Sequence, residues 1–123
     1  MSAPLRILLV EDEALVADYV ADIVEEAGHT VVGPVATGEQ AITLLEAGGI
    51  DLAILDITLK GAMNGIEVAG TARARGIPHL FISGSGDPST RAAALATQPR
   101  DFLLKPFDQD RLIEVLRAAR CRS

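Results

Sequence analysis

The sequence is poor in the residues and patterns that define several common classes of protein. Its single cysteine, Cys121, excludes an internal disulfide framework and a metal site built from cysteines. No apolar run approaches the roughly eighteen uninterrupted residues of a membrane span, so we expect no membrane association. The first four residues, Met1 to Pro4, lack the basic start and long apolar core of a signal peptide. We therefore expect a cytoplasmic protein.

Basic residues are also scarce relative to acidic ones. The 11 lysines and arginines face 17 aspartates and glutamates, which leaves a formal net charge of −6. Proteins that bind nucleic acid without regard to sequence use clustered Lys and Arg side chains to neutralise phosphates. This acidic balance therefore predicts that nucleic acid is not a partner.

The chain is long enough for one domain with a real core. It has 123 residues, of which 49% are hydrophobic, a fraction too high for a disordered chain. We expect a single domain over residues 1–123. Few residues follow the apolar positions of the last expected helix, so no output domain is expected.

Short apolar runs alternate with helical patterns along the whole chain. The runs expected to form strands cover residues 5–10, 30–35, 51–56, 79–83 and 102–104. The helical patterns cover residues 14–27, 37–47, 64–76, 89–96 and the segment after residue 108. Five strands, each followed by a helix, predict a (βα)5 fold of the α/β class. Because the runs do not alternate with polar residues, we expect a parallel sheet with helices on both faces.

Several helix ends carry recognisable signals. Thr37 with Gln40, and Asn64 with Glu67, have the spacing of a capping box. Asp108 is a candidate cap for the last helix.

Chemically active side chains follow four of the five expected strands. The first strand is followed by Glu11 and Asp12, the third ends at Asp56, the fourth ends at Ser83, and the fifth precedes Lys105. Ligands of open parallel sheets bind at the carboxyl ends of the strands, so these residues are predicted to meet. Each one alone also has an ordinary interpretation, as a helix cap, a turn residue, a loop hydroxyl or a surface charge. Their joint occurrence at one edge favours a functional site.

The residue types at this edge indicate phosphoryl chemistry. Clustered carboxylates repel one another unless protons, a basic group or a metal compensates them. An all-oxygen ligand set without His or Cys favours a hard cation such as Mg2+. A carboxylate beside this ion can attack a phosphoryl group and form an acyl phosphate. Lys105 and Ser83 would then donate to phosphoryl oxygens.

These residues resemble the receiver domains of two-component response regulators. The resemblance covers essentially the whole chain and is carried by an ordered set of motifs: Val10-Glu11-Asp12, Leu55-Asp56, Phe81-Ile82-Ser83-Gly84 and Leu104-Lys105-Pro106-Phe107. It implies a flavodoxin-like (βα)5 sandwich whose five parallel strands have the order 2-1-3-4-5. It also implies a stand-alone receiver, similar in architecture to the chemotaxis regulator.

The resemblance implies a role for each motif residue. Asp56 would accept a phosphoryl group from a sensor histidine kinase or a histidine phosphotransfer protein, and the output would pass to an unidentified protein target. Mg2+ would be held by Glu11, Asp12, Asp56 and the backbone carbonyl of Thr58. Ser83 and Lys105 would contact the phosphoryl group.

Three further features are implied by the same resemblance. Phe102 would be an aromatic switch that responds to Ser83. Thr58 and Ser85 stand where family members tune the lifetime of the phosphoaspartate. The bond between Lys105 and Pro106 would be cis.

Other functions compete with this interpretation. A phosphatase of the haloacid dehalogenase type also uses an aspartyl nucleophile with Mg2+, but it needs an Asp-x-Asp motif, and Asp56-Ile57-Thr58 lacks the second acid. The triplet Gly84-Ser85-Gly86 is not a complete nucleotide-binding fingerprint. A degenerate receiver that acts only as an interaction module stays open, although the intact acids and Lys105 oppose it.

Dimerisation is also open, since the last helix carries arginines that can pair with an acidic partner: Arg111, Arg117, Arg120 and Arg122.

Overall fold

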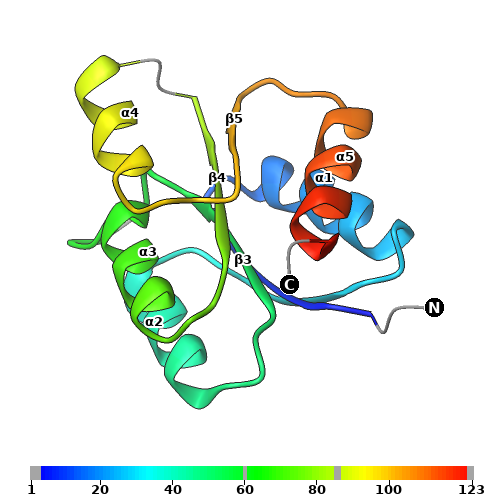
Figure 1. Ribbon diagram of the computed structural model, residues 1–123, viewed down its shortest axis with the longest axis horizontal. Coiled ribbons are helices and arrows are strands. Elements are labelled where there is room, and N and C mark those ends of the chain that lie inside the picture. The colour runs from blue at the N-terminus through cyan, green and yellow to red at the C-terminus, as the bar shows by residue number, and fades with distance from the viewer. Residues whose placement is uncertain (1–3, 60, 85–86, 122–123) are drawn as a thin grey trace.

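The protein is described by a computed structural model, which covers residues 4–59, 61–84 and 87–121. Strands and helices alternate along the chain, each strand being followed by one helix (Figure 1). The strands are β1 (Arg6–Val10), β2 (Thr30–Val35), β3 (Leu52–Asp56), β4 (His79–Ser83) and β5 (Phe102–Leu104). The helices are α1 (Ala14–Glu26), α2 (Gly38–Ala47), α3 (Gly65–Ala74), α4 (Pro88–Leu95) and α5 (Gln109–Cys121).

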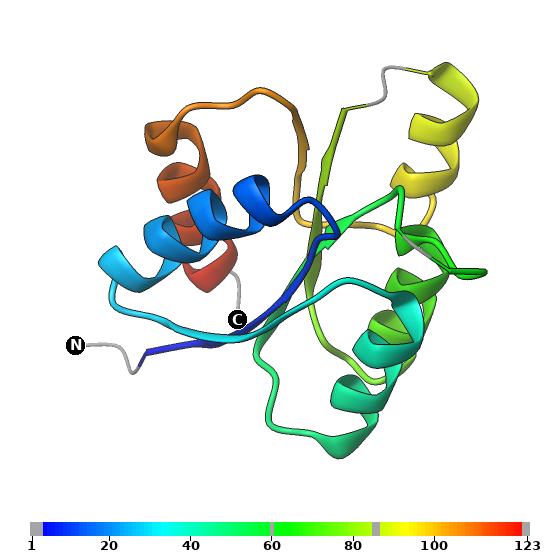
Figure 2. The same cartoon turned by 180° about the vertical axis from the view of Figure 1, so that it is seen from behind.

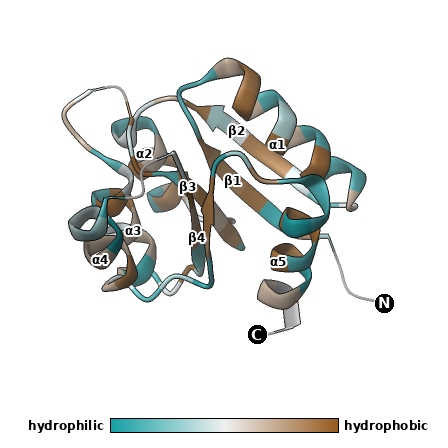
Figure 3. Ribbon diagram, turned by 90° about the horizontal axis from the view of Figure 1, so that it is seen from above, coloured by the Kyte–Doolittle hydropathy of each residue, from teal (hydrophilic) through white to brown (hydrophobic). Residues whose placement is uncertain are grey.

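The strands form one parallel sheet in the order β2-β1-β3-β4-β5. This confirms the flavodoxin-like (βα)5 fold and the strand order predicted above. Of the three interior strands, β3 and β4 are buried at every position. Figure 3 shows the hydrophobic strands enclosed between the two groups of helices.

The helices cover both faces of the sheet, as right-handed crossovers require. Helices α1 and α5 pack on one face, and α2, α3 and α4 lie on the other (Figures 1 and 2). The first face is filled by side chains such as Val20, Ile54 and Leu112, and the second by side chains such as Leu45, Leu55 and Phe81. The carboxyl ends of all the strands therefore lie at one edge, between two packed layers.

The predicted capping boxes are both present. The Thr37 hydroxyl accepts from the backbone N–H of Gln40 at 3.2 Å, and the Asn64 side chain accepts from that of Glu67 at 3.0 Å. The carboxylate of Asp108 likewise accepts from the backbone N–H of Arg111 at 2.9 Å. These side chains satisfy N–H groups that a helix leaves unpaired in its first turn.

Small differences from the predicted bounds have local causes. Strand β3 begins at Leu52, and the preceding Asp51 accepts through its carboxylate from the backbone N–H of Arg6 at 2.8 Å. Helix α4 begins at Pro88, since Asp87 caps it by accepting from the backbone N–H of Thr90 at 2.9 Å. Proline is favoured in a first helical turn, where its missing N–H costs nothing.

Helix α4 is held mainly at its C-terminal end. Ala94 is its one buried residue. Directly after the helix, the Thr97 hydroxyl donates to the Ala94 carbonyl at 2.6 Å and lies 2.8 Å from Nε2 of His79. Gln98 follows in a left-handed conformation, with φ of 58°, and accepts from the Arg73 guanidinium at 2.9 Å.

None of the helices in the described ranges is both long enough and apolar enough to cross a membrane.

Candidate functional site

The residues predicted from the strand ends meet at the carboxyl edge of the sheet. Oxygen atoms from the four carboxylates of Glu11, Asp12, Glu13 and Asp56 lie within 4.8 Å of one another. Lys105 is tied to the same edge, because its backbone N–H donates to the Ser83 carbonyl at 2.8 Å. Segments that span most of the sequence therefore contribute to one cluster.

Asp56 is buried and its backbone is tightly packed. It is the last residue of β3 and pairs with Ile82 of β4. Helix α3 begins directly against it: a side chain at Gly65 would overlap the Asp56 carbonyl oxygen. The Gly65 N–H also donates to the Ile57 carbonyl at 2.8 Å. The absence of a side chain at Gly65 thus lets α3 hold the end of β3 in place.

Lys105 is the positive charge at the centre of the cluster. Its Nζ atom lies 2.8 Å from Glu11 Oε1, 3.0 Å from Glu13 Oε1 and 3.2 Å from Asp56 Oδ2, and its side chain is 15% exposed. Burial acts to lower the pKa of Lys105, but the contacts with Glu11 and Glu13 and the charge of Asp56 outweigh burial and raise it above its usual value. The ammonium therefore stays charged and partly compensates the acids.

Glu11 is the most enclosed acid and is incompletely satisfied. Its Oε2 atom accepts from the backbone N–H of Glu13 at 3.0 Å. Its buried Oε1 atom contacts Lys105 as an ion pair but accepts no well-directed hydrogen bond within the described residues. Burial raises the pKa of the Glu11 carboxyl, the Asp56 charge adds to the effect, and Lys105 and the Glu13 N–H oppose it.

This donor set fits a hard divalent cation. It offers carboxylate oxygens within reach of one point, and one of them is buried without a directed donor. A single ammonium among four carboxylates leaves the cluster negative, so a cation is favoured there. Asp12 is half-buried, and α1 is preceded by Glu13 at the cap position, so the alternative of Asp12 as the helix cap is not what the structure shows.

The other predicted residues lie on β4, on β5 and after β3. Ser83 is buried at the end of β4, whereas Thr58 is exposed two residues after Asp56. Phe102 is 8% exposed; its ring centroid lies 6.1 Å from that of Phe81, and the Arg91 guanidinium carbon lies 4.7 Å from its centre. The bond between Lys105 and Pro106 is cis. Ser85 lies outside the described residues.

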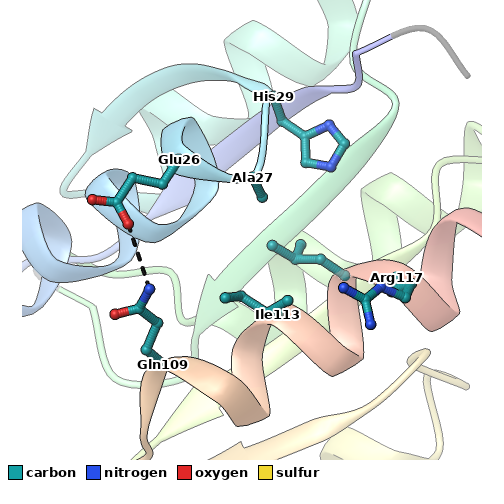
Figure 4. Close-up of a pocket in the computed structure, with 7 residues that line it drawn as sticks. Glu26, Ala27, His29, Gln109, Ile113 and Arg117 are labelled. Atoms are coloured by element: carbon teal, nitrogen blue, oxygen red, sulfur yellow. Dashed lines mark hydrogen bonds between the residues drawn. The ribbon is translucent and has the colours of Figure 1, made fainter.

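A separate hollow of about 280 Å³ lies between the end of α1 and helix α5 (Figure 4). Glu26 Oε2 accepts from Gln109 Nε2 at 3.4 Å across it, and His29 and Arg117 line it. It contains none of the predicted site residues. We therefore assign it to the packing between the two helices.

Comparison with known proteins identifies the family. Residues 7–117 match the family described as the response regulator receiver domain. The chain belongs to the response regulator receiver family. This confirms the resemblance drawn from the motifs.

Individual receivers and regulators agree with this assignment. The transcriptional regulatory protein TcrA of Mycobacterium tuberculosis is 37% identical over 115 residues, which cover 92% of this chain and 45% of TcrA. The crystal structure of the receiver domain of NtrX from Brucella abortus is 32% identical, with a TM-score of 0.86, and the match covers 95% of this chain and 99% of that one.

A third receiver has been described with a metal ion. It belongs to the sensor histidine kinase PA1611 of Pseudomonas aeruginosa, and its crystal structure has a magnesium ion coordinated in the active site cleft. It is 26% identical with a TM-score of 0.83, over 95% of this chain and 98% of that one. The present chain spans about half the length of the curated regulators that it matches.

Two contributors to the receiver's site were missed by sequence reasoning. Glu13 contacts Lys105, but in the sequence it is one more acid before a helix, a position where acids commonly serve the helix end. Gly65 packs on Asp56, and the sequence indicated only that Gly65 directly follows the capping residue Asn64. Both roles depend on contacts between different elements of the fold.

Proposed function

We propose that this receiver accepts a phosphoryl group on Asp56 from a phosphohistidine of a sensor histidine kinase or a histidine phosphotransfer protein. The observation that carries this proposal is the position of Lys105 Nζ, 3.2 Å from Asp56 Oδ2 inside a cluster of carboxylates. A nucleophilic carboxylate, an adjacent cation site and a fixed ammonium are what phosphoryl transfer to an aspartate needs.

Mg2+ is the proposed cofactor. Glu11, Asp12 and Asp56 would hold it through carboxylate oxygens, with the backbone carbonyl of Thr58. The magnesium reported for the related PA1611 receiver supports this choice, as does the all-oxygen donor set. When bound, the ion would supply positive charge against the carboxylates and the phosphoryl oxygens.

The transfer itself needs little beyond positioning. A carboxylate oxygen of Asp56 attacks the phosphorus, a new O–P bond forms, and the N–P bond to the donor histidine breaks. The electron pair of that bond goes to the imidazole nitrogen, which takes up a proton. Lys105 and the hydroxyl of Ser83 donate to phosphoryl oxygens, and the buried position of Asp56 limits the approach of water.

The response to phosphorylation is proposed to involve Ser83 and Phe102. Ser83 pairs with Leu104 of β5, and Phe102 opens the same strand, so movement at Ser83 reaches Phe102 through one short strand. Phosphorylation would bias an existing equilibrium between two arrangements of these groups. Thr58 and Ser85 are proposed to set the lifetime of the phosphoaspartate.

One experiment tests the phosphoacceptor. The protein is incubated with Mg2+ and a small phosphodonor, and intact mass and base lability of the product are measured. We expect one base-labile phosphoryl group, lost in Asp56→Asn but retained in Asp18→Asn, an exposed aspartate on α1. No labelling of the folded wild-type protein by any donor would favour the alternative of a phosphorylation-independent interaction module. Release of many equivalents of phosphate from a phosphate ester would favour the phosphatase.

The output is proposed to pass to a partner protein, with the receiver acting as a phosphoacceptor and not as an enzyme on other substrates. The acidic balance of the chain supports a protein target in preference to nucleic acid bound by this domain. The curated relatives are transcriptional regulators of about twice the length. Stand-alone action, the possible homodimer and the expected lack of DNA binding are therefore tested by size and binding measurements on the natural protein.

A further inference from the structure

Glu13 is the one acid of the four-carboxylate cluster that the proposed function does not use. Its side chain is 64% exposed, yet Oε1 lies 3.0 Å from Lys105 Nζ and accepts a hydrogen bond from it. The backbone of Glu13 is held as well, because its N–H donates to Glu11 Oε2. Its carboxylate therefore stands at the mouth of the site, on the solvent side of Lys105.

A phosphoryl oxygen has to compete with the carboxylates that already surround Lys105. The ammonium donates hydrogen bonds to Glu13 and Asp56, and its nitrogen lies 2.8 Å from Glu11 Oε1 in an ion pair. Without a bound cation, releasing the buried oxygens of Glu11 or Asp56 would leave their charge uncompensated in the interior. Releasing Glu13 costs much less, since water can solvate its exposed carboxylate.

The charge of Glu13 also opposes an incoming phosphoryl group. Glu11, Asp12 and Asp56 can share the charge of a bound cation, whereas Glu13 is compensated by Lys105. Once Lys105 turns to a phosphoryl oxygen, the Glu13 carboxylate is left close to another anion. Like charges at this separation repel, and salt screens the repulsion at an exposed position.

We propose that Glu13 is a positioning residue that holds Lys105 at the mouth of the site and slows phosphorylation by competing with the phosphoryl group for the ammonium. This role rests on the proposed function of Asp56. In this role the exposed carboxylate of Glu13 controls how readily Lys105 becomes available to the phosphoryl group.

The first test compares the rates at which Asp56 is labelled by acetyl phosphate with saturating Mg2+. We expect Glu13→Gln to label about two- to fivefold faster than wild type at low ionic strength, the effect of one exposed ion pair. The difference should shrink in 1 M salt. The matched control is Glu25→Gln, which makes the same charge change at an exposed position of α1 and should label at the wild-type rate.

The second test does not depend on phosphorylation. The side-chain 15N–1H3 resonance of Lys105 is recorded by NMR in the protein without Mg2+. Glu13→Gln should shift it and speed its exchange with water, whereas Glu25→Gln should leave it unchanged.

The outcomes separate the two proposals. If wild type is labelled but Glu13→Gln is labelled at the same rate or more slowly, the competing role of Glu13 is wrong and the phosphoacceptor stands. An unchanged Lys105 resonance in Glu13→Gln would also overturn it. A wild-type protein that no donor labels would overturn the phosphoacceptor and the role of Glu13 together.

Discussion

Helices α3 and α4 lie on the same face of the sheet, yet they are attached very differently. Helix α3 begins with a complete capping box and buries Val68, Ala69 and Ala72. Helix α4 has eight residues and buries Ala94. The strongly packed helix is the one that touches Asp56, through Gly65. The fold thus fixes the proposed phosphoacceptor firmly and leaves the neighbouring helix free to respond at lower energetic cost.

The largest predicted effect concerns the contact between α3 and Asp56. Gly65→Ala places a methyl group where the Asp56 carbonyl oxygen lies, so α3 or the end of β3 must move. We expect a loss of about 3 kcal/mol in the free energy of unfolding, measured by urea denaturation. Gly70→Ala is the matched control within α3, where an added methyl meets nothing within 4 Å, and it should stabilise the protein by about 0.5–1 kcal/mol. Equal effects at the two sites would mean that α3 is not tightly fitted to Asp56.

A second prediction concerns the anchor at the end of α4. His79 is buried beside Thr97, and burial, together with the charge of Arg73, lowers the pKa of His79 to about 4. In the unfolded chain His79 takes up a proton near pH 6.5, whereas in the folded protein it does so only near pH 4. The contribution of His79 to the free energy of unfolding is therefore fully present above pH 6.5 and is lost as the pH drops toward 4.

The expected loss from His79 is about 2 kcal/mol between pH 7.5 and pH 5. Urea denaturation at the two pH values measures it, and His79→Asn should remove most of the difference. An unchanged pH dependence in that variant would show that His79 is not the group responsible.

The smallest effect compares the caps of the two helices. Asn64→Ala should lower the free energy of global unfolding by about 1 kcal/mol, because α3 unfolds together with the core. Asp87→Ala removes the cap of α4 and should mainly speed amide hydrogen exchange in α4, with less change in global stability. If both variants lower global stability equally, α4 is as firmly coupled to the core as α3.

Sequence patterns predicted the features that depend on neighbouring residues. The bounds of β2, β4 and β5 were predicted without error. For β4 the signal is local, because Pro78 and Gly84 stand directly on either side of the apolar run. The capping boxes at Thr37 and Asn64 are also local signals. Parallel topology then predicted which strand ends meet, and so the grouping of Glu11, Asp12, Asp56, Ser83 and Lys105 at one edge.

Features that depend on contacts between different elements were not predictable in this way. No pattern in the sequence indicates that Glu13 reaches Lys105, which is 92 residues away, or that Gly65 lies against the Asp56 carbonyl. The single buried position of α4 was not predictable either, because alanine favours a helix whether it faces the core or the solvent. These details follow from packing, which periodicity describes only on average.

The burial of β3 at every position makes the fold sensitive to an error in strand register. Along a strand, successive side chains point to opposite faces, so a slip of one residue against β1 or β4 would exchange the faces of all five. Asp56 would then leave the acidic edge and enter an apolar layer. Correct strand register is therefore needed both for the core and for the position of the proposed phosphoacceptor, and one misalignment would disturb both.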